Sequence, residues 1–255
     1  RALGGAGIRF GADGTNEDGR RAWLWVAATA TVVAFRVALS RGQRVARELV
    51  GTLRAGVLVS DRYLGYAYIG VHNRQLCWAH LEREFVRMSE RRGASGRVGR
   101  SLVKVAKEVF AARRALDEGR LESEAWVTKM GELRQRAREQ LEMESGFTVR
   151  EHERSERTRT RNTCRELLRL EPAMWTFVRR ADVALTNNLA ERSLRHAVLW
   201  RRASFGSQSA AGAECVARLL TVVMTRRARG LSAHDYFVAA CAAARAGQSA
   251  PSLLG

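Results

Sequence analysis

The chain has 255 residues, 46% hydrophobic and 27% charged, which is enough for one large folded domain or a core with a sizeable insertion. Its 44 lysines and arginines exceed its 26 acidic residues, and the net charge of +18 predicts a polyanionic partner, because basic side chains release counterions from phosphates. The longest apolar run, residues 23–35, is too short to cross a bilayer, so we expect no membrane-embedded protein.

Cysteine usage indicates a reducing compartment. The four cysteines lie far apart, without the spacing of a secreted disulfide scaffold, and the first residues contain no apolar signal-peptide core. We therefore expect a cytoplasmic protein. The chain starts at Arg1 without a methionine, so we also expect a fragment of a longer protein.

The first third of the chain predicts strands around one helix. Apolar, aromatic and β-branched runs predict strands at residues 22–28, 31–38, 57–60 and 76–79. Glycine-rich residues 4–11 predict only a poor strand, because glycine has no side chain to pack. Residues 43–54 have helical spacing, and the buried strand 57–60 ends at Asp61. An acid at the carboxyl end of a buried strand is the usual position of a site in an open α/β sheet.

The rest of the chain predicts helices. A basic, glycine-containing break is expected at residues 91–97, and the charged residues 150–161 predict a solvated connector or a basic arm. The expected helices span residues 81–90, 101–116, 122–143, 163–170, 171–179, 214–229 and 234–244. Periodicity alone thus indicates a mixed α/β protein with a helical half.

One further helix, expected to begin at Asn187, carries the most specific pattern. Asn188, Glu191 and Arg195 follow one another at spacings of three and four, so they share one helix face. Such a face can hold a divalent cation through Glu191 and a phosphate through Arg192 or Arg195, as phosphoryl transfer requires. The alternative is an ordinary N-capped helix with a Glu–Arg pair four residues apart.

Several blocks of sequence resemble the insertion-sequence-66 family of bacterial transposases. They are Arg20-Arg-Ala-Trp-Leu-Trp-Val26, Val59-Ser-Asp-Arg-Tyr-Leu-Gly-Tyr66, Gln75-Leu-Cys-Trp-Ala-His-Leu81, and Thr186-Asn-Asn-Leu-Ala-Glu-Arg-Ser-Leu-Arg195 with the following Trp200-Arg-Arg-Ala-Ser-Phe-Gly-Ser-Gln208. The resemblance covers residues 19–244. Nothing matches the DNA-binding and zinc-binding segments that precede this region in the family.

The resemblance implies a ribonuclease-H-like α/β/α core with a large helical insertion and C-terminal helices. We expect residues 1–92 to form the first part of this core and residues 93–183 the insertion. Residues 184–255 are expected to complete the core with its third acid and the closing helices.

The resemblance also implies a DDE-type site, in which Asp, Asp and Glu hold two Mg²⁺ or Mn²⁺ ions about 3.5–4 Å apart. Asp61 matches the second acid and Glu191 the third. Asp13 is the choice for the first acid, although Gly14 stands where the family has Glu. Glu17 and Asp18 lie nearer the expected hairpin, but their setting is typical of a turn.

Basic, aromatic and amide side chains beside these acids are candidates for DNA contacts. The candidates are Arg62, Tyr66, Asn188, Arg192, Arg195, Arg201 and Arg202. Arg62 and Tyr66 could equally pack and form ion pairs. Cys77-x-x-His80 has the spacing of half a zinc site, but no second close Cys or His pair accompanies it. We therefore favour a buried cysteine beside a locally bonded histidine over zinc.

The function implied is metal-dependent DNA strand cleavage and strand transfer at the ends of an insertion sequence. The expected partners are the transposon ends, the target DNA, further copies of the chain on paired ends, and accessory proteins of the element, at the bacterial nucleoid. Two alternatives stay open: a decayed or truncated remnant that only binds DNA, and a metal-dependent nuclease without strand transfer. Asp13 distinguishes the remnant from the transposase, because an active transposase requires Asp13 to lie beside Asp61 and Glu191 in the fold.

Overall fold

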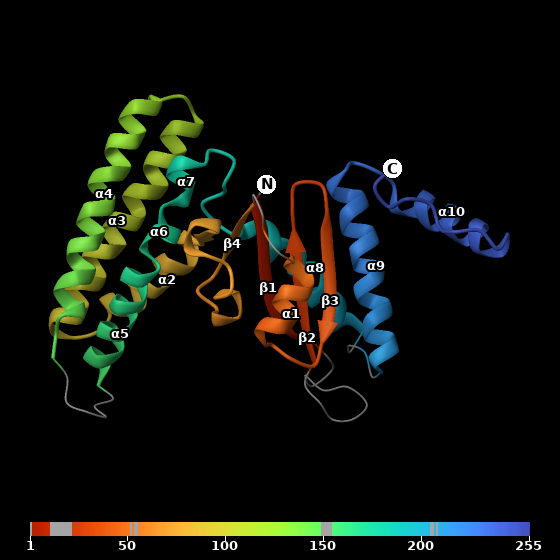
Figure 1. Cartoon of the computed structure of the whole chain (residues 1–255), viewed down its shortest axis with the longest axis horizontal. Helices are drawn as coiled ribbons and strands as arrows, with labels where there is room; N and C mark the ends of the chain where they lie inside the picture. The colour runs from red at the N-terminus through yellow and green to blue at the C-terminus, as the bar shows by residue number, and fades with distance from the viewer. Residues whose placement is uncertain are drawn as a thin grey trace. The chain divides into compact units, whose positions relative to one another are not determined.

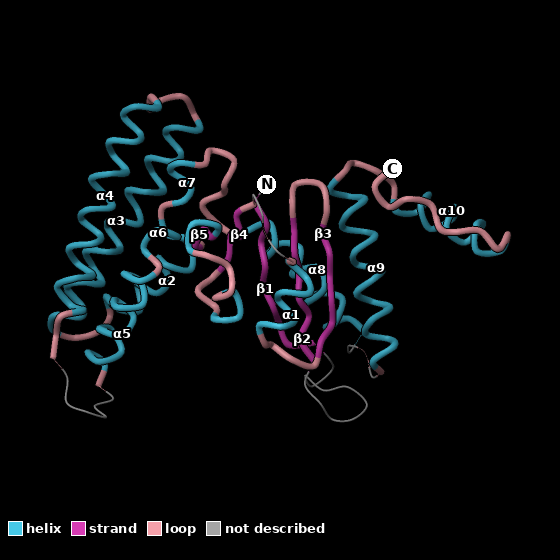
Figure 2. The backbone as a smooth tube through the Cα atoms, in the orientation of Figure 1, coloured by secondary structure: helices cyan, strands magenta, loops and turns pink. Residues whose placement is uncertain are grey.

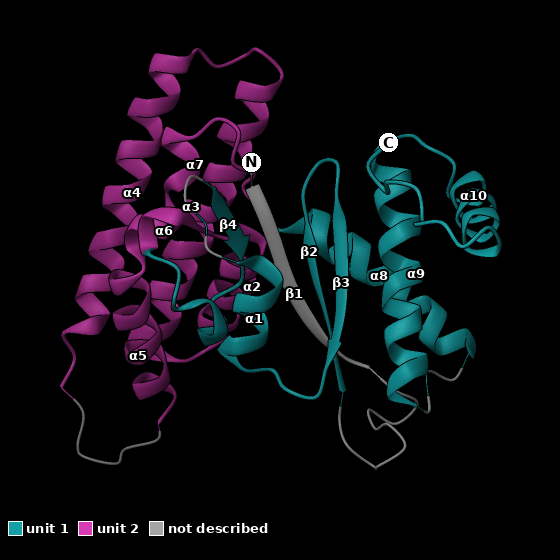
Figure 3. Ribbon diagram, turned by 45° about the vertical axis from the view of Figure 1, so that its right-hand side comes forward, with its two compact units in different colours: residues 1–70, 187–255 teal, residues 71–186 magenta. Residues whose placement is uncertain are grey.

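The computed structural model describes residues 2–10, 22–51, 53, 56–148, 155–204, 207 and 209–255 (Figure 1). The fold is mixed α/β and mostly helical, as the periodicity of the sequence predicts. Two compact units divide the chain (Figure 3). Unit 1 comprises Arg1–Gly70 and Asn187–Gly255, and unit 2 is Val71–Thr186.

The described strands of unit 1 lie side by side in the order β3-β2-β1-β4 (Figure 2), and β5 belongs to unit 2. Strands β1, β2 and β3 pair antiparallel, with Phe10 opposite Ala22 and Ala28 opposite Val33. Strand β4 runs parallel to β1. The strands are β1 (Ala2–Phe10), β2 (Ala22–Ala28), β3 (Val33–Ala38), β4 (Val57–Ser60) and β5 (Arg74–Leu76).

Strand β1 is where the sequence prediction was wrong. The glycine-rich segment expected to be a poor strand lies between β2 and β4, and Gly5 is in register with both Ala27 and Ser60. A glycine lacks a packing side chain but keeps both its N–H and its C=O. Main-chain pairing from two neighbouring strands therefore holds β1 in the sheet.

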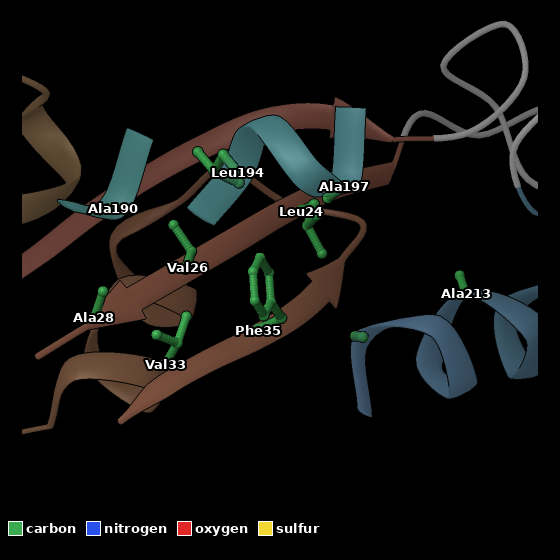
Figure 4. Packing of buried hydrophobic residues seen from close by; sticks show 10 residues of the cluster. Leu24, Val26, Ala28, Val33, Phe35, Ala190, Leu194, Ala197 and Ala213 are labelled. Carbon is green, nitrogen blue, oxygen red and sulfur yellow. The ribbon is translucent and has the colours of Figure 1, made fainter. Parts of the chain in front are cut away.

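In unit 1, helices cover both faces of the sheet. Alternate residues of β2 point to opposite faces: Leu24 and Val26 belong to a core with α8 and α9 (Figure 4), whereas Trp25 belongs to a core with α1 and the short helix η1. This alternation makes three layers, helix, sheet and helix. The covering helices are α1 (Gln43–Val50), η1 (Leu64–Tyr66), α8 (Asn188–Ser204) and α9 (Ala210–Ala228), and α10 (Ala233–Arg245) follows them.

Helix α9 also covers the outer edge of the sheet. The fully buried Thr225 hydroxyl accepts a hydrogen bond from the Val33 N–H (3.1 Å) and donates one to the Val33 C=O (2.9 Å). The Phe35 N–H donates to the Thr221 hydroxyl (2.9 Å). An uncovered edge strand presents unpaired main-chain groups that invite association with other chains, and α9 satisfies those of Val33 and the N–H of Phe35.

Replacing Thr225 with valine is therefore expected to lower the free energy of unfolding of unit 1 by about 2 kcal/mol, because two buried main-chain groups lose one shared partner. Chemical denaturation and amide hydrogen exchange at Val33 measure the effect. The matched control is Thr128→Val on an exposed helix position, which should change stability by less than about 0.5 kcal/mol. Unchanged exchange at Val33 in Thr225→Val would contradict the edge-covering role.

Unit 2 consists mainly of helices that pack along one another. They are α2 (Trp78–Ser89), α3 (Gly93–Asp117), α4 (Ser123–Ser145), α5 (Glu156–Arg169), α6 (Glu171–Met174) and α7 (Thr176–Arg179), with the short helix η2 (Val71–Asn73) and β5 before them. The expected break at 91–97 is shorter than predicted, since α3 already begins at Gly93. The expected connector becomes helical at Glu156, because the Ser155 hydroxyl accepts a capping hydrogen bond from the Thr158 N–H (3.2 Å).

Buried polar side chains fix α6 and α7 beside β5. Gln75 donates to the Met174 carbonyl (3.0 Å) and accepts from the Phe177 N–H (2.9 Å). The Trp78 indole also donates to the Met174 carbonyl (2.7 Å). The single helix expected at 171–179 is interrupted at Trp175, whose backbone leaves the helical region.

The compact units differ from the expected domains at one boundary. Unit 2 ends at Thr186, close to the predicted end of the insertion at 183, but it begins at Val71 instead of 93. The difference arises because α2 packs along α3 and so joins the helical unit. The three-part domain division itself stays a prediction.

Candidate active site

Asp61 is the first residue after β4, in unit 1. Its carboxylate oxygen Oδ1 accepts a hydrogen bond from the Tyr63 N–H (3.1 Å), and its carbonyl accepts one from the hydroxyl of the buried Ser60 (2.9 Å). The side chain is half-buried. Two local hydrogen bonds therefore fix both the turn and the direction of the carboxylate at the carboxyl end of a buried strand.

Aromatic rings pack beside the Asp61 loop. Tyr66 is 1% exposed, and its ring meets those of Trp25 and Tyr63 edge-on, with centroids 6.4 and 5.9 Å apart. Burial, and then the negative charge of Asp61, raise the pKa of Tyr66 well above its usual range, so the phenol stays neutral. Because its ring is covered, Tyr66 is a core residue in this structure and offers no face on which a base could stack.

Arg41 places a positive charge beside this aromatic group. Its guanidinium carbon lies 4.9 Å from the Trp23 ring centroid and 4.6 Å from that of Tyr63, and the Tyr63 hydroxyl donates to the Arg41 carbonyl. Arg41 is not among the candidates predicted from the sequence. Its position depends on the fold, because Trp23 and Tyr63 belong to different elements.

Glu191 lies in the first turn of α8, also in unit 1. Helix α8 begins at Asn188, directly after the buried Asn187, and the Glu191 N–H donates to the Asn187 carbonyl (3.2 Å). This confirms the helix start predicted from the sequence. Ala190 and Leu194 anchor α8 on the sheet, which leaves Glu191 half-buried beside the anchored face.

The other candidates on α8 lie on its outer side. Asn188, Arg192, Arg195 and Arg202 are exposed, whereas Arg201 is partly buried. Arg62, next to Asp61, is also partly buried. The structure thus groups exposed guanidinium groups on the helix that carries Glu191, a suitable arrangement for binding phosphate.

Asp61 and Glu191 come from elements that the sheet brings near each other. Helix α8 packs on β1 and β2, and β1 is the neighbour of β4, whose end carries Asp61. Asp13, the predicted first acid, lies outside the described residues, as do Glu17 and Asp18. Strand β1 contains no acidic residue. Within the described ranges no group of three His, Cys, Asp or Glu side chains is arranged to hold a metal ion.

Cys77 and His80 belong to unit 2, whereas Asp61 and Glu191 belong to unit 1. Cys77 is buried and precedes α2, and its carbonyl accepts from the His80 N–H (3.1 Å).

None of the helices in the described part of the chain combines the length and apolar composition needed to cross a membrane.

A basic α/β unit with a strand-end carboxylate and an arginine-bearing helix fits the class of proteins that act on nucleic acids. The chain belongs to the family described as "Transposase IS66 family", whose model matches residues 7–215. The match includes both Asp61 and Glu191 and confirms the family predicted from the sequence blocks. No curated protein and no solved structure matches the chain.

Proposed function

We propose that this chain is the catalytic region of a DNA transposase that cuts DNA at the ends of an insertion sequence and joins those ends to a target. The observation that carries the proposal is the placement of Asp61 and Glu191. They are far apart in the sequence, yet both belong to unit 1 and lie on elements that contact β1 or pair with it.

The topology of unit 1 supports a ribonuclease-H-like core. Its strands follow the order β3-β2-β1-β4, with a three-stranded antiparallel part and a parallel β4, and helices cover both faces. The candidate acids then occupy the carboxyl end of β4 and the helix on β1, a plausible site in an open α/β sheet.

The chemistry of the acids fits hard divalent cations. Asp61 and Glu191 would provide carboxylate oxygens to Mg²⁺ or Mn²⁺, with Asp13 as the proposed third ligand. Two such ions, when bound, activate the attacking oxygen and stabilise the leaving oxygen at a phosphodiester. The chain itself orients the Asp61 carboxylate through the Tyr63 N–H. Exposed Arg192 and Arg195 would hold the DNA phosphates beside Glu191.

The substrates we propose are the two element ends and the target DNA in the bacterial nucleoid. Water as the nucleophile would give strand cleavage, and a DNA 3′-hydroxyl would give strand transfer. Further copies of the chain on paired ends and element-encoded accessory proteins complete the proposed assembly.

One observation favours a remnant as the second candidate function. The sequence has Gly14 where family members carry Glu, and β1 provides no acid of its own. A chain without a first acid would keep the basic surface and bind DNA without cutting it.

The test is nicking of supercoiled plasmid DNA by the purified protein. We expect nicked product with Mg²⁺ or Mn²⁺ and none with a chelator, and we expect joined products when pre-cleaved element ends are added. Salt-sensitive DNA binding without any metal-dependent nicking would reject the transposase and favour the remnant. Nicking without joined products would favour a nuclease.

A further inference from the structure

Helix α3 carries a continuous line of basic side chains that the candidate active site does not use. It is 25 residues long, and five of its six basic residues, all but Arg113, recur at spacings of three, four, three and seven, so these five share one helix face. All are exposed. We call this face the α3 basic stripe: Arg97, Arg100, Lys104, Lys107 and Arg114.

Packing on the other side of α3 fixes the direction of the stripe. Val98, Leu102, Val105 and Val109 are almost completely buried in unit 2. Because these residues hold one side of the helix inside the unit, the basic side chains stay on the surface together. The stripe is therefore a fixed surface of a packed helix.

Acidic side chains near the stripe are engaged elsewhere. Glu108 accepts two hydrogen bonds from Arg136 of α4 (both 2.8 Å), and Asp117 pairs with Arg113 (2.9 Å). Over the described residues, no carboxylate lies within ion-pair distance of the stripe's five cations. Arg100 makes one hydrogen bond, to the Ser89 carbonyl (3.3 Å).

Helix α4 shows what an ordinary solvated face looks like in the same unit. Its exposed cations are matched with acids: Arg136 with Glu108, and Arg138 with Glu142. Alternating charges of this kind need no partner. The stripe lacks such matching, so its positive charge remains available to an external anion.

We propose that the α3 basic stripe binds the phosphate backbone of duplex DNA, as a second DNA-binding surface outside the candidate active site. At a rise of 1.5 Å per residue, Arg97 and Arg114 are about 25 Å apart along the helix, long enough to meet several successive phosphates. Backbone contacts of this kind position DNA without reading its sequence. The choice of DNA as the polyanion rests on the proposed function.

The test is a triple variant with Arg97→Gln, Lys104→Gln and Lys107→Gln. Its binding to a 30-base-pair duplex of arbitrary sequence is measured by fluorescence anisotropy over a range of salt concentrations, with a chelator present so that cleavage plays no part. We expect at least tenfold weaker binding and a salt slope smaller by about three, one for each lost phosphate contact. Circular dichroism checks that the variant is folded.

The matched control is Lys129→Gln, Arg136→Gln and Arg138→Gln, which removes the same charge from ion-paired positions of α4. We expect its salt slope to stay within about one of the unaltered protein. Equal losses in both variants would overturn the proposal, because only net charge would then matter. Unchanged binding by the stripe variant would overturn it too, as would a loss seen with duplex RNA but not with duplex DNA.

These results stand apart from the proposed function. A protein that never nicks DNA but loses duplex binding in the stripe variant would reject the catalytic proposal and keep the stripe. Metal-dependent nicking by the unaltered protein, together with unchanged duplex binding by the stripe variant, would keep the catalytic proposal and reject the stripe.

Discussion

Replacing Asp61 with asparagine is expected to lower metal-dependent nicking about a thousandfold while unit 1 stays folded. Bound metal ions stabilise the transition state by several kcal/mol, and each 1.36 kcal/mol of activation free energy corresponds to a tenfold change in rate. Asparagine removes the charge that a Mg²⁺ ion requires, but its Oδ1 can still accept from the Tyr63 N–H. The substitution therefore separates a metal ligand from a turn residue.

Three further variants complete this experiment. Glu191→Gln should cause a comparable loss, because it removes the second proposed carboxylate and keeps the size of the side chain. Glu48→Gln is the matched control: it removes one negative charge from the same unit, at an exposed residue that pairs with Arg36, and nicking should change less than about twofold. Asp13→Asn asks whether the first acid has been chosen correctly.

Plasmid nicking rates and thermal unfolding are measured on the same preparations. Loss of nicking with an unchanged melting temperature in Asp61→Asn supports the metal site. Full activity in Asp61→Asn would remove Asp61 from the site. Full activity in Asp13→Asn alone would leave the other two acids in place and move the search to Glu17 and Asp18.

Sequence patterns predicted well those elements whose own residues decide them. Strand β2 is a continuous run of apolar and aromatic residues, and α8 carries Asn188, Glu191 and Arg195 at helical spacing, so both were visible in the sequence. The Asp61 turn was also visible, since an acid ends a short apolar strand. The resemblance of the sequence blocks added the prediction that Asp61 and Glu191 act together, which no local pattern contains.

Other features depend on partners that a sequence does not reveal. Strand β1 is held by hydrogen bonds from two neighbouring strands, and its glycines gave no signal of that. For Tyr66 the sequence left a DNA contact and a packing role equally open, and the structure buries its ring beside those of Trp25 and Tyr63. Arg41 acquires its position from Trp23 and Tyr63, which come from separate elements. Such features follow from tertiary packing, which overrides local preference.

The start of helix α3 is the clearest example of an element that depends on tertiary packing. Its first turns contain Gly93, Gly96 and Gly99, a spacing that indicated a break in the chain because glycine weakens helices. In the fold Gly99 lets α3 approach the last turn of α2 closely. A Cβ at Gly99 would lie 2.5 Å from the Met88 carbonyl carbon and 2.7 Å from the Ser89 Cα. The sequence feature that argued against a helix is therefore what allows it to pack.

Gly99→Ala is accordingly expected to lower the free energy of unfolding of unit 2 by about 3 kcal/mol. The atoms that the new methyl group would strike belong to the α2 backbone, which cannot rotate away as a side chain can, so the helices must separate. Gly131→Ala on α4 is the matched control, since nothing lies within 4 Å of its Cβ position. It should raise stability by up to about 1 kcal/mol, because alanine is the better helix former.

Chemical denaturation of both variants, followed by circular dichroism, gives the two changes in free energy. Opposite signs for the same Gly→Ala substitution would separate close helix packing from helix propensity, since propensity alone predicts a gain at both positions. A stabilised Gly99→Ala would mean that α2 and α3 do not approach as described. The direction of the α3 basic stripe would then lose its support as well, because it depends on α3 being held against the rest of unit 2.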